Sequence, residues 1–271
     1  MIYNAKNGIV KIDDVEMRYI SFGHGSKKLV MIPGLGDGLR SVKGMALPFA
    51  FMYREFVNEY EVFIFSRKNE LEDGYTTRDM ARDTANAMQQ LGIENADIIG
   101  VSQGGMIAQY LAIDYPHLIH KLVLVVTLAR QNDIVQNVIP KWIDMAQKND
   151  YEKLMVDNFE MMYTEEYLEK YRKLYPIVTK VGKPKDFQRF LIMANACLIH
   201  DAYDELGKIS APTYVIGAKE DRVVGAEGSV EIANVIKGAR LHMYEGIGHA
   251  AYEEADDFTA RVCGFLNEIN L

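Results

Sequence analysis

The residue best suited to carry a reaction in this sequence is Ser102, at the centre of a Gly-Val-Ser-Gln-Gly segment, residues 100–104. A short apolar run precedes it, and apolar residues at helical spacing follow it until Pro116. In so tight a strand-to-helix turn the serine backbone is strained, and only glycine two places before and after leaves room for the chain. We therefore predict a nucleophile elbow, with Ser102 beside a helix N-terminus that favours negative charge.

A serine hydroxyl needs a base to accept its proton, and the base needs a third group to orient it. Both follow Ser102 along the chain: Asp221 in the exit loop of one predicted strand, and His249 in the glycine-flanked loop after the last strand. Glu220 is an alternative acid, whereas residues 127–131 offer no carboxylate. The alternative bases follow no late strand in such a loop; they are His24, His117, His120, His200 and His242.

A second feature is the glycine-rich loop of residues 33–38, Pro-Gly-Leu-Gly-Asp-Gly, directly after the apolar strand 29–32. It does not fit a dinucleotide-binding loop, because the third glycine comes one residue early and Leu39 stands where glycine or alanine belongs. We interpret these glycines as letting backbone amides approach a ligand above the strand end. Gly34 is therefore a predicted substrate-binding residue.

The elements that must position these residues alternate between strands and helices. Such alternation predicts an α/β fold, a mostly parallel sheet with helices on both faces, preceded by a hairpin around Asp13 and Asp14. We expect one helix over 49–60. We expect another at the C-terminus, with an apolar face reaching Ile269 and an acidic first turn; the acidic residues are Glu253, Glu254, Asp256 and Asp257.

Residues 130–205 break this alternation. They are helical in character and rich in methionine and aromatic residues. A simple crossover needs far fewer residues, so we predict a helical lid of about four helices inserted into a core of residues 1–129 and 206–271. A lid with adaptable apolar side chains should face an apolar substrate, and we name Trp142 and Met161 as binding residues.

Composition limits the classes of function. The net charge of −8, without a basic run, argues against nucleic-acid binding. Cys197 and Cys263 fit neither a disulfide framework nor metal-ligand spacing. The first residues lack the apolar core of a signal peptide, and the longest apolar run, 122–129, is too short to span a bilayer. We expect a cytoplasmic protein that binds no membrane, metal or cofactor.

The elbow at residues 100–105, the acid loop at 217–221 and the Gly248-His249 pair match the pattern of one family. Over essentially its whole length the chain resembles a lid-bearing α/β-hydrolase. The resemblance implies a catalytic triad of Ser102, Asp221 and His249, with an oxyanion hole from the backbone amides of Leu35 and Gln103. The chain departs from the family at Pro33, where His is common.

These observations predict a cofactor-independent serine hydrolase acting on a carboxylic ester or lactone of a small to medium apolar substrate. The same triad also serves C–C bond or enol-lactone hydrolysis, perhydrolysis and aminopeptidase action, and fold does not choose among them. Aminopeptidase ranks lower because the acidic lid face shows no clear pocket for a cationic amine. A low-turnover small-molecule sensor and a non-catalytic scaffold are alternatives of another class, and the oligomeric state is open.

Overall fold

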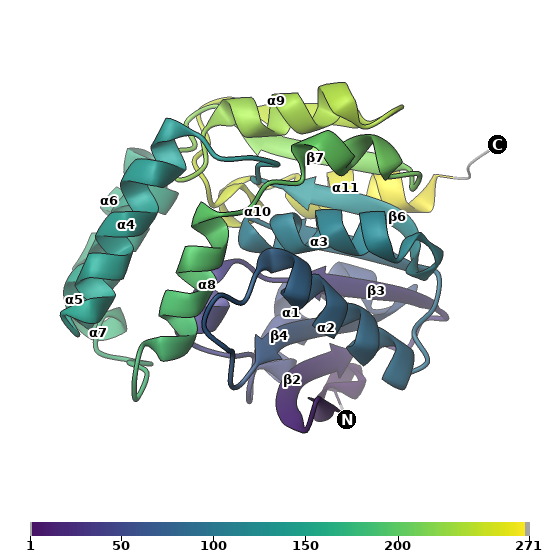
Figure 1. The fold of residues 1–271 in the computed structure, drawn as a ribbon, viewed down its shortest axis with the longest axis horizontal. Coiled ribbons are helices and arrows are strands. Elements are labelled where there is room, and N and C mark those ends of the chain that lie inside the picture. The colour runs from purple at the N-terminus through teal and green to yellow at the C-terminus, as the bar shows by residue number, and fades with distance from the viewer. Residues whose placement is uncertain (1, 269–271) are drawn as a thin grey trace.

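An eight-stranded sheet runs through the computed structural model, which describes residues 2–268 (Figure 1). The strand order is β1-β2-β4-β3-β5-β6-β7-β8, and all pairs from β4 to β8 are parallel. The strands are β1 (Lys6–Ile12), β2 (Val15–Phe22), β3 (Lys27–Ile32), β4 (Tyr60–Lys68), β5 (Ala96–Val101), β6 (Ile119–Val125), β7 (Thr213–Ala218) and β8 (Arg240–Tyr244). The predicted mostly parallel α/β sheet is confirmed.

The antiparallel part of the sheet comes first in the chain. Ile12 pairs with Val15 across a tight turn in which Asp13 and Asp14 both have positive φ, 49° and 65°. Aspartate tolerates the left-handed region because its short side chain bonds locally, which explains why the hairpin turns here. The central strands are buried after the two lysines that open β3 and up to the half-buried Val101 that ends β5, as strands covered on both faces must be.

Helices cover both faces of the sheet (Figure 1). One face packs against α2 (Thr77–Gln90), α3 (Gln103–Asp114) and α9 (Ala226–Val235), and the other against α1 (Ala46–Met52) and α11 (Phe258–Asn267). Each face has its own cluster of buried apolar side chains. The two clusters fix the sheet edge from which the functional loops emerge.

Five helices lie between β6 and β7, within the described part of the chain, where about four were expected. They are α4 (Asp133–Gln147), α5 (Tyr151–Met162), α6 (Glu165–Tyr171), α7 (Tyr175–Val178) and α8 (Gln188–Leu198). In Figure 1 they stand beside the ends toward which the strand arrows point. We refer to residues 130–205 as the helical segment; its division from the core as a separate lid remains a prediction.

Two expected helices differ in the structure. The helix expected over 49–60 begins earlier and ends at Met52, because Tyr53 has left helical geometry (φ −106°, ψ 30°). The expected C-terminal helix is two helices, α10 (Ala251–Glu254) and α11, since Ala255 is extended (φ −89°, ψ 113°). Ile269 lies outside the described residues.

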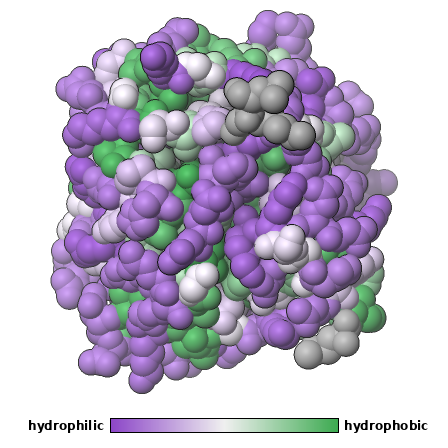
Figure 2. Space-filling model, turned by 90° about the vertical axis from the view of Figure 1, so that its right-hand side faces the viewer, coloured by the Kyte–Doolittle hydropathy of each residue, from purple (hydrophilic) through white to green (hydrophobic). Residues whose placement is uncertain are grey.

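The molecular surface away from the helical segment is mostly polar. Figure 2 shows that face, on which hydrophilic residues predominate and apolar ones are scattered. Between residues 2 and 268 no helix combines the length and apolar character needed to cross a bilayer.

Candidate active site

Ser102 lies between β5 and α3 in a strained backbone conformation, with φ 54° and ψ −121°. A methyl group on Gly104 would lie 1.9 Å from the carbonyl oxygen of Ile32, and one on Gly100 would lie 2.5 Å from that of Gly104. The Ser102 carbonyl accepts a hydrogen bond from Thr127 Oγ1 at 2.8 Å. The strained elbow predicted from glycine spacing is therefore present, because crowding on both sides excludes any side chain.

The glycine-rich loop after β3 lies against the elbow. A methyl group on Gly34 would be 3.3 Å from Ser102 Cβ and 3.7 Å from its Oγ. Leu35 opens a short 3₁₀ helix (Leu35–Gly38) and Gln103 opens α3. The first amides of a helix lack an intrahelical acceptor, so both N–H groups are free to bind a ligand next to Ser102. Their role as an oxyanion hole remains a proposal.

Asp221 and His249 meet at the ends of β7 and β8. The distance from His249 Nδ1 to Asp221 Oδ2 is 2.8 Å, and both side chains are buried. Asp221 Oδ1 accepts backbone hydrogen bonds from Val223 at 2.8 Å and Val224 at 3.0 Å. The carboxylate is thus held by both oxygens, so it can fix the orientation of the imidazole and stabilise its protonated form.

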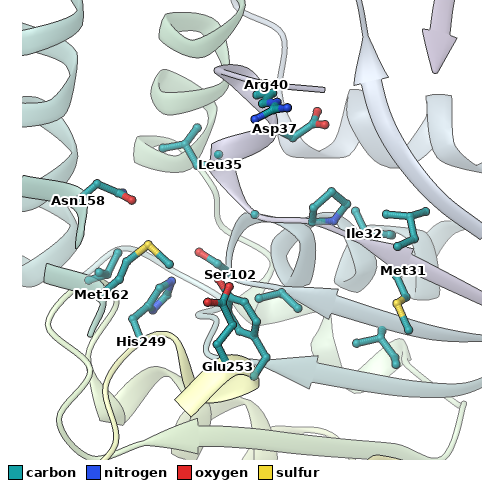
Figure 3. Close-up of a pocket in the computed structure, with 18 of the residues that line it drawn as sticks. Met31, Ile32, Leu35, Asp37, Arg40, Ser102, Asn158, Met162, His249 and Glu253 are labelled. Carbon is teal, nitrogen blue, oxygen red and sulfur yellow. The ribbon is translucent and has the colours of Figure 1, made fainter. Parts of the chain in front are cut away.

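Ser102 and His249 line the same cavity, and Figure 3 shows the imidazole beside the serine. No hydrogen bond joins these two side chains in the structure, although both belong to its described residues. Catalytic hydrogen bonds are often long before substrate binds. The structure therefore brings the three predicted residues to one sheet edge, while their action as a triad remains a proposal.

The alternative candidates lie elsewhere. His24 and His117 are exposed, His120 pairs with Asp97, and burial lowers the pKa of His200 to about 3. Burial also lowers the pKa of His242, on β8. Glu220 is exposed, and its carboxylate accepts a hydrogen bond from the Ile247 amide at 3.1 Å.

The loop carrying His249 is packed against the end of α5. A methyl group on Gly248 would lie 2.6 Å from the Met162 carbonyl oxygen, and the Ala250 amide donates to that oxygen at 3.0 Å. The Gly248 amide donates to Glu254 Oε2 at 2.8 Å. The helical segment thus contacts the loop of the candidate base directly, which couples its position to that of the imidazole.

The cavity above Ser102 has a volume of about 400 Å³ and a mostly apolar lining. Gly34 and Trp142 line it, as predicted. Met161 does not, whereas its neighbour Met162 does (Figure 3), and a substrate-binding role for Met161 stays a prediction. Adjacent helical residues point about 100° apart, so a shift of one residue exchanges the side chain that faces the cavity.

A buried polar network at the cavity wall was not foreseen, and its central residue, Asp37, lines the cavity. Asp37 accepts from Ser66 Oγ at 2.6 Å and from the Arg67 amide at 2.9 Å, and it pairs with Arg189 of α8. Gln103 Oε1 accepts from Arg67 at 3.2 Å. Burial lowers the pKa of Arg67 to about 10. The network connects the glycine loop, the elbow and the helical segment, and nothing in the local sequence pattern links Arg189 to Asp37.

Two further charged residues line the cavity unpredicted, Arg40 and Glu253, and Figure 3 shows them on opposite sides of Ser102. Arg40 forms no ion pair with a carboxylate of residues 2–268; it contacts Met45 Sδ at 3.9 Å. From the sequence, Glu253 was explained by the favourable interaction of acidic residues with a helix N-terminus. It was therefore not identified as a cavity residue. The short α10 puts it there.

The described residues offer neither a cluster of metal ligands nor an activated thiol. Among residues 2–268 no three histidine, cysteine or acidic side chains gather as metal ligands. Cys197 also lines the cavity, but burial raises the pKa of its thiol to about 12. A thiol of that pKa is almost wholly protonated at neutral pH and is a weak nucleophile.

Several known proteins are similar to this chain in sequence or in fold. A 2-hydroxy-6-oxo-6-phenylhexa-2,4-dienoate hydrolase from Comamonas testosteroni is 28% identical over 69% of this chain and 68% of its own length. A 2-hydroxy-6-oxononadienedioate/2-hydroxy-6-oxononatrienedioate hydrolase from Paraburkholderia xenovorans (strain LB400) is 26% identical over 93% and 91%. The solved enol-lactonase from Burkholderia xenovorans LB400 matches with a TM-score of 0.81 at 21% identity, over 96% of this chain and 100% of that one, which shows the fold.

A family model described as alpha/beta hydrolase fold matches residues 29–256. That match includes the glycine loop, the elbow, and the loops of Asp221 and His249. Because the matched residues build strands β3 to β8 and the loops around the cavity, the chain belongs to the alpha/beta hydrolase fold family.

Proposed function

We propose that this protein is a serine hydrolase that cleaves a carboxylic ester or lactone of a small to medium apolar substrate through an acyl-enzyme on Ser102. The observation that carries the proposal is the convergence of a strained Ser102 with a His249–Asp221 pair joined at 2.8 Å, all at one cavity. Hydrolase is also the activity in the names of the relatives compared above.

In the proposed reaction Ser102 Oγ attacks the carbonyl carbon while His249 accepts its proton. His249 then donates that proton to the leaving oxygen, and an acyl-enzyme forms. Water, activated by the same imidazole, adds to the acyl carbon and releases the acid and Ser102. Asp221 stabilises the imidazolium that exists between these proton transfers.

The amides of Leu35 and Gln103 are proposed to hold the oxyanion of both tetrahedral intermediates. Each opens a helix beside Ser102, and the α3 N-terminus adds its positive dipole. Loss of one such donor typically costs about 10²- to 10³-fold in rate. The buried Asp37–Arg67–Gln103 network supports this proposal, because it ties both amide-bearing segments to Arg67.

The apolar lining supports an apolar substrate. Side chains of α4 and α5 close the cavity opposite Ser102, among them Trp142, Phe159 and Met162. We propose that the helical segment acts as the lid that selects this substrate and excludes water during acyl transfer.

A second candidate is hydrolysis of a C–C bond next to a ketone. The compounds in the relatives' names, 2-hydroxy-6-oxo-dienoates, contain a ketone and no ester. Arg40 gives the cavity a cation without a carboxylate partner among the described residues, which suits a substrate acid. The same nucleophile and base serve both reactions, so substrate panels must separate them.

The test is a fluorophosphonate probe, which reacts covalently with activated serines. We expect stoichiometric labelling of wild type and none of Ser102→Ala. The matched control is Ser41→Ala, because Ser41 lines the same cavity and should not affect labelling. On p-nitrophenyl esters of increasing acyl length, Ser102→Ala should lose about 10⁶-fold in kcat.

The outcomes separate the alternatives. Equal labelling of wild type and Ser102→Ala would refute the nucleophile. Turnover of a 2-hydroxy-6-oxo-dienoate, with poor activity on every ester and lactone, would favour C–C hydrolysis. Labelling with only slow single-turnover kinetics on all of these compounds would favour a sensor.

A further inference from the structure

Glu253 is a carboxylate in the wall of the cavity that the proposed hydrolysis does not use. It lies on α10, four residues after His249, and Figure 3 shows it beside Ser102. Its side chain remains accessible and accepts one hydrogen bond, from Tyr163 Oη to its Oε2 at 2.7 Å. A free carboxylate oxygen therefore remains available to a ligand.

Aromatic side chains surround this carboxylate. Tyr53, Tyr163 and Tyr252 line the cavity together with it. Phe49 stacks on Tyr53 at 6.0 Å between ring centroids, and Tyr167 stacks on Tyr163 at 4.7 Å. Burial, and after it the charge of Glu253, raises the pKa of the Tyr53 and Tyr252 hydroxyls, as a nearby negative charge must.

The carboxylate has no basic partner. No lysine or arginine of residues 2–268 forms an ion pair with Glu253, and the next residue in the chain, Glu254, is another acid. A cation placed beside this carboxylate pairs with it directly and favours its ionised form.

We propose that Glu253 and the tyrosines around it form a subsite for an organic cation, an alkylammonium group carried by the substrate. The faces of aromatic rings attract such a cation within about 6 Å of their centroids, and a carboxylate adds direct charge pairing. An apolar cation shell, such as methyl groups on nitrogen, suits the aromatic walls better than a hydrated ion does.

Charge also sets the orientation of such a substrate. Arg40 lines the cavity on the other side of Ser102 from Glu253 (Figure 3), so a cationic group is repelled at one end and attracted at the other. The sequence predicted no pocket for a cationic amine in the helical segment, and the acidic group does not belong to that segment. It comes from the core, just after the candidate base.

This inference rests on the proposed function only for the position of the scissile bond, and binding can be tested without turnover. In Ser102→Ala protein, we would measure by calorimetry the affinities of acetylcholine, the acetate ester of choline, and of 3,3-dimethylbutyl acetate. These two esters have the same shape and differ in a charged nitrogen against a neutral carbon. We expect the choline ester to bind about tenfold more tightly.

The Ser102→Ala/Glu253→Gln protein should bind both esters within about twofold of each other. The matched control is Ser102→Ala/Glu245→Gln, which makes the same charge change at a surface residue outside the cavity. It should retain the preference for the choline ester. Tyr53→Leu should reduce the preference by removing one ring. Equal binding of the two esters, or a preference that survives Glu253→Gln, would overturn the inference.

Wild-type kinetics then separate the two proposals. A wild type that hydrolyses neither ester, although Ser102→Ala prefers the choline ester, refutes ester hydrolysis and leaves the subsite standing. A wild type that hydrolyses both with equal kcat/KM, together with equal binding, supports the hydrolase and removes the subsite.

Discussion

The strand-end loops and the helical segment meet at one cavity but are built differently. Ser102, Asp221 and His249 emerge from the sheet, and the glycines around Ser102 are crowded on all sides. The outer part of the helical segment instead exposes large apolar side chains to 43–64%; they are Tyr171, Leu174, Ile177 and Val181. One region tolerates almost no change of shape, and the other has room to adapt.

The difference separates reaction from selection. Groups that exchange protons must be held to fractions of an ångström, which parallel strands and tight turns provide. Groups that only contact a substrate can be soft and apolar, as Met162 and Trp142 are. Changes in the loops should therefore act on kcat or folding, and changes in the helical segment on KM.

Among changes that leave the nucleophile in place, the largest expected effect is that of Asp221→Asn. The amide keeps the shape but favours the wrong tautomer of His249 and cannot stabilise its charge, so kcat should fall about 10⁴-fold. Ester hydrolysis by purified protein measures this. The neighbouring Glu220→Gln serves as control and should remain within about twofold of wild type. Equal losses in the two variants would show that Asp221 is not the orienting acid.

Gly104→Ala tests the rigidity of the elbow. The added methyl would lie 1.9 Å from the Ile32 carbonyl oxygen, so the variant should lose about 3 kcal/mol of stability or fail to fold. Thermal unfolding should show a decrease in Tm of roughly 10 °C. Gly264→Ala, in α11 with nothing within 4 Å of the new methyl, should leave Tm unchanged or raise it. Similar Tm values for both would contradict the crowding argument.

His200, where the chain leaves α8, tests the junction of the two regions. Burial lowers its pKa to about 3, from an unfolded value of about 6.5. Between these values the unfolded chain binds the extra proton, so acidification destabilises the native state, by about 2 kcal/mol at pH 5. In urea unfolding, the free energy of unfolding of wild type should fall between pH 7 and pH 5. The decrease for His200→Asn should be smaller by about 2 kcal/mol.

The exposed His117→Asn is the control for that experiment and should follow the wild-type pH dependence. If His200→Asn also follows it, the imidazole of His200 is not the group that resists protonation in the folded protein.

The smallest effect distinguishes two adjacent methionines. Met162→Ala removes apolar contact from the cavity and should raise KM for an apolar ester about tenfold, with kcat within about threefold. Met161→Ala, outside the cavity lining, should change neither by more than about twofold. Steady-state kinetics on one p-nitrophenyl ester decide between them, and a larger KM effect at Met161 would support the original sequence prediction.

Sequence alone determined the features that depend on local chemistry. Glycines two residues on either side of Ser102 specify a tight elbow, and apolar runs without alternation specify buried parallel strands. The order of Ser102, Asp221 and His249, each after a strand, placed them at one sheet edge before any coordinates. The elbow and the buried strands were predicted correctly because neighbours in the chain set them.

Tertiary structure decided which distant side chains meet. Arg189 of α8 reaches Asp37, and Met162 rather than Met161 enters the cavity. Glu253, expected in the first turn of one longer helix, lies on the separate α10 and lines the cavity. No local pattern encodes these contacts, because each depends on the rotation and docking of a helix. A turn of about 100° per residue exchanges one side chain for its neighbour, and only packing against the rest of the molecule fixes that angle.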